Sequence, residues 1–326
     1  MADAINKYEL LEPFSNRNAG YSRWTKASKN EHFYFIKEFM KPKYPDKVTL
    51  DESLRQIRIK ECEKFEADKK TLYAAIDGAS DGNLVRIEEF FRADSRYYIA
   101  TEWIDSCGLD FYEISKKDLK DKLLLCRTAA HSLKQLHSAG IIHSDIKATN
   151  VIVKESAGGK LVAKIIDFDS GFFENDPPRN EDELGGDQVY MSPEACLFLC
   201  GEDVGLTCKM DVFALGLLFH QYLTGELPYY DQKEYAYAHE AVLDDVVLRA
   251  DSSAIEPELQ KLIEKMLLKD AERRPGSAKV YDILTAYYNK QFPPQKKGPK
   301  GQEPELFPRD TRIKFSKNLL HKAGDL

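Results

Sequence analysis

Residues 51–76 contain neither glycine nor proline and are rich in charged side chains that favour helices. A segment of this kind predicts one long helix. The residues before it alternate short apolar runs with turn residues, and 33–36 is expected to form a strand. Two further strand candidates, 84–91 and 97–104, follow the helix. The first third of the chain is therefore expected to combine several strands with one long helix.

The remainder of the chain is predicted to be mostly helical. Apolar side chains recur at helical spacing over 119–137, and 212–223 is apolar nearly all round, which is typical of a buried helix. Short strands are expected at 151–153 and 161–166, on either side of a glycine turn. A strand-rich part followed by a helical part predicts two lobes, and a ligand site is expected in the cleft between them.

The composition is that of an ordinary soluble globular enzyme, with 43% hydrophobic and 31% charged residues. The formal net charge of −7 gives no overall basic field to hold nucleic acid or an anionic membrane. The amino terminus lacks a secretory signal pattern, and the most apolar stretch, 212–219, is too short to cross a bilayer. The six cysteines include no C-x-x-C pair and are expected to be reduced thiols. We therefore expect a cytoplasmic protein without nucleic-acid or membrane partners, and the oligomeric state stays open.

The segment 141–151 carries the most informative polar side chains and reads IIHSDIKATNV. It joins a helix end to a strand, so these side chains are expected on a rigid loop. Phosphoryl transfer needs an acceptor for the substrate hydroxyl proton, a charge partner for the phosphoryl group and a metal ligand. Asp145 supplies a carboxylate that orients an attacking hydroxyl, Lys147 a point cation suited to phosphate, and Asn150 a neutral oxygen for a hard cation. The loop therefore predicts the chemistry of phosphoryl transfer.

This segment resembles the catalytic loop H-R-D-x-K-x-x-N of protein kinases, with Ser144 in place of the arginine. Seventeen residues past Asn150 comes the sequence Asp167-Phe168-Asp169, which resembles the metal-binding D-F-G motif. The resemblance implies that Asp167 chelates a Mg²⁺ ion that bridges the β- and γ-phosphates of ATP, with Asn150 as a second metal ligand. The order and spacing of the two motifs make the resemblance specific.

Two further segments resemble the nucleotide-binding parts of the same family. Lys37 ends the sequence Y-F-I-K, which is similar to the V-A-I-K strand, and it is therefore expected to hold the α- and β-phosphates. The sequence T-E-W-I is similar to the hinge of the family, so backbone groups of Glu102 and Ile104 are expected to face adenine. These residues complete the expected ATP site.

Later motifs imply particular contacts in the second lobe. The sequence Y-M-S-P-E at 190–194 resembles the end of a kinase activation segment. The sequence D-A-E-R-R-P resembles D-P-x-x-R-P, which implies a buried ion pair between Arg274 and Glu194. Asp211, in the sequence D-V-F-A-L-G, is expected to brace the catalytic loop. The resemblance covers about residues 8–290, nearly the whole chain.

The fold that the resemblance implies is a bilobal, protein-kinase-like α+β fold. An antiparallel β-sheet N-lobe with one long helix is expected at 1–103, a mainly helical C-lobe at 104–292, and a C-terminal linker and tail at 293–326. The implied function is transfer of the γ-phosphate of ATP, with Mg²⁺, to Ser or Thr hydroxyls of a protein substrate, including autophosphorylation. Lys147, two residues after Asp145, is similar to the lysine of Ser/Thr-specific enzymes.

The chain departs from the family pattern at the glycine-rich loop and near the end of the activation segment. Residues 14–24 hold only Gly20 where the family has G-x-G-x-x-G-x-V, so Gly20 is the expected phosphate-binding glycine. Fewer glycines reduce the approach of backbone to phosphate, which predicts slower turnover or altered nucleotide geometry. Asp187 stands where Ser/Thr kinases place a threonine. Its carboxylate can accept from Lys147 but repels Asp145 when both are ionised.

The acidic partner of Lys37 is expected on the long helix, as in the family. Glu66 is the favoured candidate because it shares a helix face with Tyr73. Glu63 is the second candidate, and Asp68 is a third with a shorter reach. The sequence leaves this choice open.

Two substitutions bear on regulation. Ser144 replaces the arginine that reads a phosphorylated activation loop in many family members, and the segment between Asp167 and Glu194 is acidic. A phosphate added there meets like charge, so a phosphate-driven on-switch is not expected. Asp169 replaces the glycine of D-F-G, and aspartate tolerates left-handed backbone better than most residues.

Two alternatives to a protein kinase stay open. The first is a pseudokinase that acts as a nucleotide-binding or scaffolding module, which the poor glycine-rich loop favours. The retention of Lys37, Asp145 and Asp167 argues against it. The second is a kinase of small molecules on the same fold. The S-P-E segment with Arg274, together with Lys147, favours a protein substrate.

Overall fold

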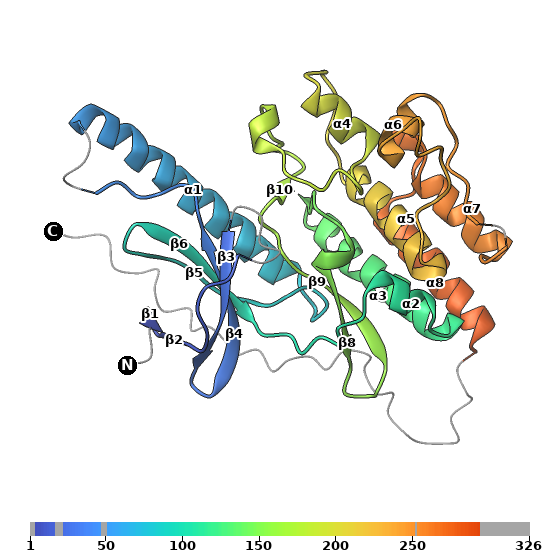
Figure 1. The fold of residues 1–326 in the computed structure, drawn as a ribbon, viewed down its shortest axis with the longest axis horizontal. Helices are drawn as coiled ribbons and strands as arrows, with labels where there is room; N and C mark the ends of the chain where they lie inside the picture. Colours follow the sequence, from blue (N-terminus) through green and yellow to red (C-terminus); the bar gives the residue numbers. More distant parts are fainter. Residues whose placement is uncertain (1–3, 17–21, 47–50, 252, 294–326) are drawn as a thin grey trace, which may run out of the picture.

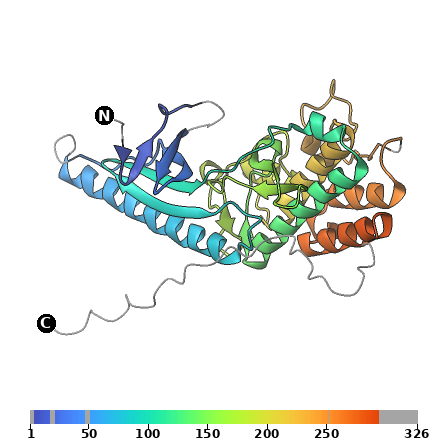
Figure 2. The same ribbon diagram turned by 90° about the horizontal axis from the view of Figure 1, so that it is seen from below.

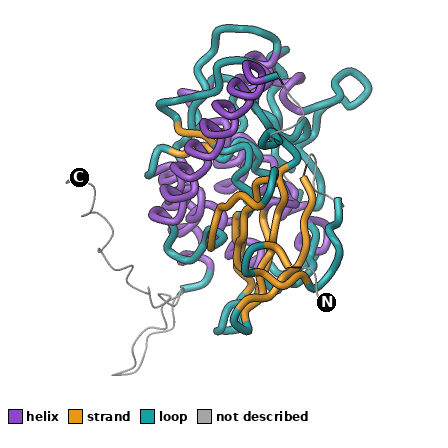
Figure 3. Tube along the Cα trace, turned by 90° about the vertical axis from the view of Figure 1, so that its left-hand side faces the viewer, coloured by secondary structure: helices purple, strands orange, loops and turns teal. Residues whose placement is uncertain are grey.

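The computed structural model describes residues 4–16, 22–46, 51–251 and 253–293. Within these ranges a curled sheet and one long helix lie at one end of the molecule and most of the helices lie at the other (Figure 1). Seen from the side, most of the strands lie in the first lobe and most of the helices lie in the second lobe (Figure 3). This arrangement confirms the predicted α+β fold with a sheet-containing first lobe and a mainly helical second lobe. The predicted tail lies outside the described residues beyond 293.

The sheet is antiparallel throughout, and its strands lie in the order β1-β2-β3-β4-β6-β5. The turn between the third and fourth strands places Asn30 and Glu31 in the left-handed backbone region, as a tight hairpin turn requires. Strand alternation buries Tyr34 and Ile36 on the outer face and turns Lys37 to the other face. The described strands of this sheet are β1 (Ala4–Ile5), β2 (Tyr8–Leu10), β3 (Ser22–Lys29), β4 (His32–Phe39), β5 (Ile87–Ala93) and β6 (Arg96–Glu102).

The predicted long helix is confirmed as α1 (Glu52–Ala79). Its second half packs on the sheet through Leu72, Tyr73 and Ile76, which are buried. Phe65 adds an edge-to-face contact with Tyr97 of β6, with ring centroids 5.2 Å apart. The first turns of α1 extend beyond the sheet (Figure 2). The packed half therefore fixes which α1 side chains reach the inside of the first lobe.

Seven described helices contain most of the core of the second lobe. The expected buried helix at 212–223 is confirmed within α5, whose side chains are buried from Met210 to Leu223. The helical periodicity at 119–137 corresponds to α3, which passes into a left-handed glycine, Gly140. None of the helices in the described ranges is both long and apolar enough to span a membrane. The helix bounds are α2 (Phe111–Ser115), α3 (Leu119–Ser138), α4 (Pro193–Leu199), α5 (Lys209–Thr224), α6 (Ala238–Leu243), α7 (Pro257–Met266) and α8 (Ser277–Gln291).

Two short antiparallel strand pairs lie where the sheet and the helices meet. β7 (Ile141–Ile142) pairs with β10 (Phe172–Phe173), and β8 (Val151–Glu155) pairs with β9 (Leu161–Ile165). The backbone of Val85 donates a hydrogen bond to β9, which ties the segment before β5 to the second lobe. The loops after β7 and after β9 therefore emerge side by side, and they carry the two motifs with the predicted catalytic residues. Three short 3-10 turns complete the described elements: η1 (Ala148–Asn150), η2 (Glu181–Glu183) and η3 (Ala271–Arg273).

Candidate active site

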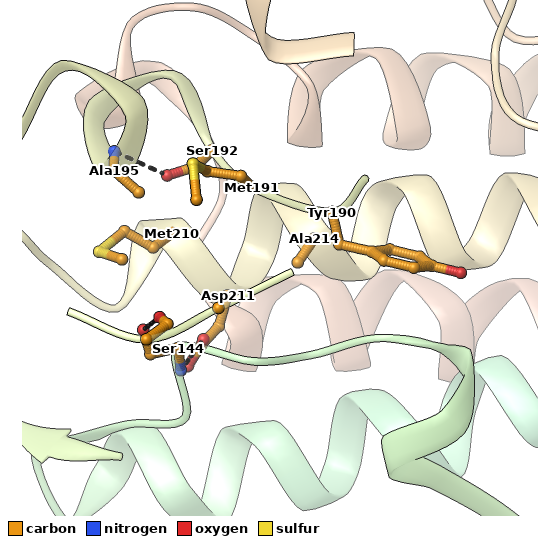
Figure 4. Close-up of a pocket in the computed structure, with 10 residues that line it drawn as sticks. Ser144, Tyr190, Met191, Ser192, Ala195, Met210, Asp211 and Ala214 are labelled. Carbon is orange, nitrogen blue, oxygen red and sulfur yellow. Dashed lines mark hydrogen bonds between the residues drawn. The ribbon is translucent and has the colours of Figure 1, made fainter. Parts of the chain in front are cut away.

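The loop after β7 is braced by Asp211, a carboxylate of α5 that is only 1% exposed. Asp211 accepts the backbone N–H groups of His143 and Ser144 at 2.7 and 2.8 Å, and it lies 2.9 Å from His137 Nε2. Ser144 has a φ of +67°, so the chain turns sharply at this contact. The expectation that Asp211 braces the loop is confirmed. Figure 4 shows Ser144 and Asp211 facing each other below the segment that begins at Tyr190.

Asp145 has one engaged carboxylate oxygen and one that is free. Its Oδ2 accepts a hydrogen bond from Asn150 Nδ2 at 2.8 Å and lies 2.9 Å from Lys147 Nζ. Its Oδ1 is buried and has no hydrogen-bond partner among the described residues. The three residues predicted for catalysis are thus brought into direct contact, and the buried oxygen is placed to accept a hydrogen bond.

The loop after β9 is linked directly to this loop. The Ile166 N–H donates to the Asn150 carbonyl at 3.0 Å, and His143 Nε2 lies 3.0 Å from the Ile166 carbonyl. Asp167 follows Ile166 with a φ of +64°, which turns the chain toward β4. The two predicted metal-binding residues, Asn150 and Asp167, therefore belong to hydrogen-bonded neighbouring segments.

The donor set fits a Mg²⁺ ion that arrives with a nucleotide. The described residues contain no group of three or more His, Cys, Asp or Glu side chains that could hold a metal by itself. Asn150 donates through its amide nitrogen, and the described residues give no hydrogen bond to its amide oxygen. The carboxylate of Asp167 and the amide oxygen of Asn150 fit a Mg²⁺ site of the kind in which the protein supplies few oxygen ligands and substrate phosphates complete the coordination.

Lys37 lies between two carboxylates. Its Nζ donates to both oxygens of Asp167 at 2.8 Å and lies 2.7 Å from Asp169 Oδ2. Burial by itself lowers the pKa of Lys37, but the carboxylates of Asp169 and Asp167 outweigh it and raise the pKa above its usual value. Lys37 is therefore a fixed positive charge in the site, as its expected contact with phosphate requires.

The expectation that Glu66 pairs with Lys37 is wrong. Glu66 Oε1 lies 2.6 Å from Lys70 Nζ, one turn along α1. The α1 side chains that reach the loop after β9 are Lys69, whose Nζ donates to the Asp169 carbonyl at 2.5 Å, and Tyr73, whose hydroxyl lies 3.3 Å from Asp169 Oδ1. Glu66 shares a face with Tyr73 but lies two turns earlier, about 10 Å along the helix axis, so it does not reach the loop that Tyr73 contacts.

The other two candidates for the partner of Lys37 give no such contact either. Asp68 pairs with Lys64, at 3.3 Å, and the described residues give no contact between Glu63 and Lys37. Asp169 is the acid that sequence reasoning missed. The available signal was an additional carboxylate directly after Asp167 and Phe168, where the family pattern has glycine.

The hinge candidates lie at the end of β6 and just after it. The Glu102 N–H donates to the Arg86 carbonyl at 3.0 Å, and its side chain accepts the Arg86 N–H at 2.7 Å. Glu102 also forms an ion pair with Lys164 of β9, which is 7% exposed and was not anticipated from the sequence. Ile104 lies two residues further on, and none of the described residues accepts a hydrogen bond from its N–H. Gly20 lies outside the described residues.

The end of the activation segment contacts the catalytic loop closely. Ser144 Oγ donates to the Gly185 carbonyl at 2.8 Å, and a Cβ on Gly186 would lie 2.9 Å from the Ser144 carbonyl. Asp187 follows, and its Oδ2 lies 3.7 Å from Lys147 Nζ. Asp187 therefore shares Lys147 with Asp145.

A pocket between this segment and α5 has a volume of about 20 Å³, room for about one water molecule (Figure 4).

The predicted ion pair of the second lobe is confirmed. Arg274 contacts both carboxylate oxygens of Glu194, at 2.6 and 2.9 Å, and both side chains are buried. Arg274 also donates to the carbonyls of Leu268, Lys269 and Lys209. A buried pair whose remaining donors are satisfied in this way holds α4 against the loop before α8.

Comparison with known proteins gives one family and several distant relatives. The model of the family described as protein kinase domain matches residues 47–285. The match begins after β4, so Lys37 and the glycine-loop region lie before it.

The chain is similar to serine/threonine-protein kinase PSK2 of Saccharomyces cerevisiae, with 29% identity over 216 residues, 65% of the chain and 18% of the relative. It is similar to Aurora kinase of Dictyostelium discoideum, with 27% identity over 194 residues, 59% of the chain and 47% of the relative. It is also similar to serine/threonine-protein kinase Pkn1 of Myxococcus xanthus, with 23% identity over 229 residues, 70% of the chain and 31% of the relative. The chain matches less than half the length of each of these three relatives.

Proposed function

The chain belongs to the protein kinase domain family, and on that premise we propose that it is an active Ser/Thr protein kinase. In this proposal it transfers the γ-phosphate of ATP to a protein hydroxyl with the help of Mg²⁺, and it also phosphorylates itself. The observation that carries the proposal is the buried, unpaired Oδ1 of Asp145 beside Lys147 and Asn150. The names of two of these relatives, PSK2 and Pkn1, support Ser and Thr as acceptors.

Asp145 is the residue that orients the substrate hydroxyl. Its Oδ2 is held by Lys147 and Asn150, so the carboxylate cannot rotate freely, and Oδ1 is left to accept the hydroxyl hydrogen. A hydroxyl held in this way has an oxygen lone pair directed at the γ-phosphorus. Its proton passes to the carboxylate as the new P–O bond forms and the bond from the γ-phosphorus to the bridging oxygen breaks, which releases ADP. Lys147 stays beside the same carboxylate and faces the charge that develops on the transferred group.

The nucleotide is held by residues of both lobes. Lys37 contacts the α- and β-phosphates, and the backbone of Glu102 and Ile104 faces adenine. The Ile104 N–H, which no described residue engages, supports this assignment. Asp167 and the amide oxygen of Asn150 hold the Mg²⁺ that accompanies ATP, and this ion supplies positive charge that screens the phosphate oxygens. The roles of these residues are part of the proposal.

The test is transfer of labelled γ-phosphate from ATP with Mg²⁺ to the full chain itself and to a generic acceptor protein. We expect label on Ser or Thr by phosphoamino-acid analysis, and we expect Asp145→Asn to reduce transfer about 10²–10⁴-fold. Asp203→Asn, which neutralises an exposed carboxylate before α5, serves as the matched control and keeps full transfer. Folded wild-type protein that binds ATP but transfers no label would instead make the chain a nucleotide-binding module.

A further inference from the structure

Lys37 needs a partner in the protein that holds its side chain in place before and after the nucleotide phosphates reach it, and Asp167 alone does not provide it. The Lys37 side chain is 11% exposed, and a buried ammonium without a counter-charge carries a large desolvation penalty. In the proposed function Asp167 directs its carboxylate to Mg²⁺, which removes it from Lys37. Asp169 Oδ2, at 2.7 Å, is the other carboxylate in contact with Lys37 among the described residues. It remains in place when Asp167 turns to the metal.

Asp169 is itself anchored by α1. Tyr73 donates its hydroxyl to Asp169 Oδ1 at 3.3 Å, and Lys69 donates its ammonium to the Asp169 carbonyl at 2.5 Å. Tyr73 is 3% exposed, so its ring has little freedom to move. Both contacts come from the packed half of α1, and together they hold the carboxylate and the backbone of one residue.

The charges of this group balance. Lys37 and Lys69 bring two positive charges, and Asp167 and Asp169 bring two negative charges. Burial lowers the pKa of Lys69, the carboxylates of Asp169 and Asp167 oppose that shift, and the charge of Lys37 adds to it. The two ammonium groups therefore act on the same carboxylates. An acid on α1 is not needed for neutrality, which fits the pairing of Glu66 with Lys70 instead.

We propose that Asp169 is the positioning residue that holds Lys37 against the nucleotide phosphates, and that Lys69 and Tyr73 fix Asp169 to α1. This inference rests on the proposed kinase function and deepens it. The charges at the contact between α1 and the site are the reverse of those expected from the family. The helix contributes a cation and a hydroxyl, and the loop after β9 contributes the acid. The acid that positions Lys37 is thus two residues from Asp167 in sequence and moves with it.

The decisive experiment moves the acid from the loop after β9 to helix α1. Asp169→Gly removes the acid, and we expect kcat to fall about 10²-fold, because a displaced catalytic group loses about that factor. The double variant Asp169→Gly with Lys69→Glu places an acid on the same face of α1, and we expect it to recover kcat to within about tenfold of wild type. Lys70→Glu, one position along the helix and on its exposed face, is the matched control and leaves kcat unchanged.

A second readout separates this inference from the proposed function and from simple misfolding. Titration of a fluorescent ATP analogue without Mg²⁺ measures whether Lys37 is positioned for phosphate, even where no transfer occurs. We expect Asp169→Gly to raise Kd about tenfold, the double variant to restore it, and thermal melting to show all variants folded. Wild-type protein that binds the analogue but transfers no label overturns the proposed function alone.

Two results would overturn the positioning role. One is an Asp169→Gly variant with wild-type kcat and Kd. The other is a double variant no better than the single one while both melt like the wild type. Tyr73→Phe removes only the hydroxyl that contacts Asp169 Oδ1, and we expect a fall in kcat of about threefold with KM for the protein acceptor unchanged.

Discussion

Two segments enter the candidate active site, and they are held by different kinds of contact. The loop at 143–150 is held through its backbone, because Asp211 accepts N–H groups of His143 and Ser144. The segment 167–169 is held mainly through its side chains, by Lys37 of β4, 130 positions from Asp167, and by Tyr73 of α1, 96 positions from Asp169. The contact that Asp211 makes does not depend on which side chains the loop at 143–150 carries. The contacts of the segment 167–169 do depend on its side chains.

This difference explains where the chain has departed from the family pattern without losing the arrangement. Ser144 replaces an arginine, yet the brace is intact because the contact uses the Ser144 N–H. In the second segment a substitution changes the contact itself. Asp169 replaces a glycine and brings a carboxylate to Lys37, and α1 meets that carboxylate with the hydroxyl of Tyr73. A contact between two side chains can be replaced when both residues change together, whereas a contact to a backbone group survives substitution of the residue that carries it.

The largest expected effect is loss of the backbone brace. Asp211→Ala leaves the N–H groups of His143 and Ser144 without their acceptor, and each unsatisfied buried donor costs about 1–3 kcal/mol. We expect the free energy of unfolding to fall by about 2–6 kcal/mol and transfer activity to disappear. Urea denaturation and the labelling assay measure the two effects.

Asp211→Asn is the matched control for this variant because it keeps one oxygen acceptor in the same place. We expect it to lose less stability than Asp211→Ala. The comparison also predicts that Asp169→Gly, which acts on the other segment, loses rate with little loss of stability. An Asp169→Gly variant as unstable as Asp211→Ala would show that both segments are structural braces, and the distinction between them would fail.

A smaller effect is expected at Asp187, whose side chain contacts Lys147 of the loop at 143–150. Its carboxylate lies 3.7 Å from Lys147 Nζ and therefore competes with Asp145 for the same cation. Asp187→Thr removes the charge and keeps a hydrogen-bonding group, so we expect kcat to rise up to about tenfold. Asp176→Thr, at an exposed acid of the same segment, is the control. A fall in kcat on Asp187→Thr would mean that the carboxylate helps to hold Lys147 in its working position.

The main helices and the contacts that family motifs imply could be predicted from the sequence. The helix at 51–76, the buried helix at 212–223 and the pair between Glu194 and Arg274 all follow from patterns that the structure confirms. Helix-favouring residues without Gly or Pro predict the first helix, and an apolar surface nearly all round predicts the second, because such a segment is buried. The order of motifs then places the catalytic loop between its neighbours.

Side-chain contacts between distant elements that follow from no family motif could not be predicted in the same way. Acids and lysines alternate along α1, so several of its residues offered a charge for Lys37, and a shift of one position turns a side chain by about 100°. Packing of the aromatic residues of α1 on the sheet decides which turn of the helix faces the loop after β9, and this put Lys69 rather than Glu66 beside Asp169. The pair of Glu102 and Lys164 joins two strands that no local pattern connects.

The smallest expected effect concerns the far end of α5, the helix that supplies Asp211. His220 is 2% exposed, its Nδ1 lies 2.7 Å from the Glu226 carbonyl, and its Nε2 accepts the Asp251 N–H at 3.1 Å. A proton on Nε2 would oppose that N–H, and burial lowers the pKa of His220 below its usual 6.5. Below that pH the unfolded chain binds more protons than the folded chain, so this contribution to stability is present above about pH 6.5 and is lost as pH falls.

The measurement is thermal unfolding between about pH 8 and pH 5, with His220→Gln as the variant that does not titrate in this range. We expect the melting temperature of the wild type to fall more steeply with decreasing pH than that of His220→Gln. His32→Gln, at an exposed histidine of β4, is the control and keeps the wild-type slope. Equal slopes in all three proteins would show that His220 stays neutral in both states or is protonated in both.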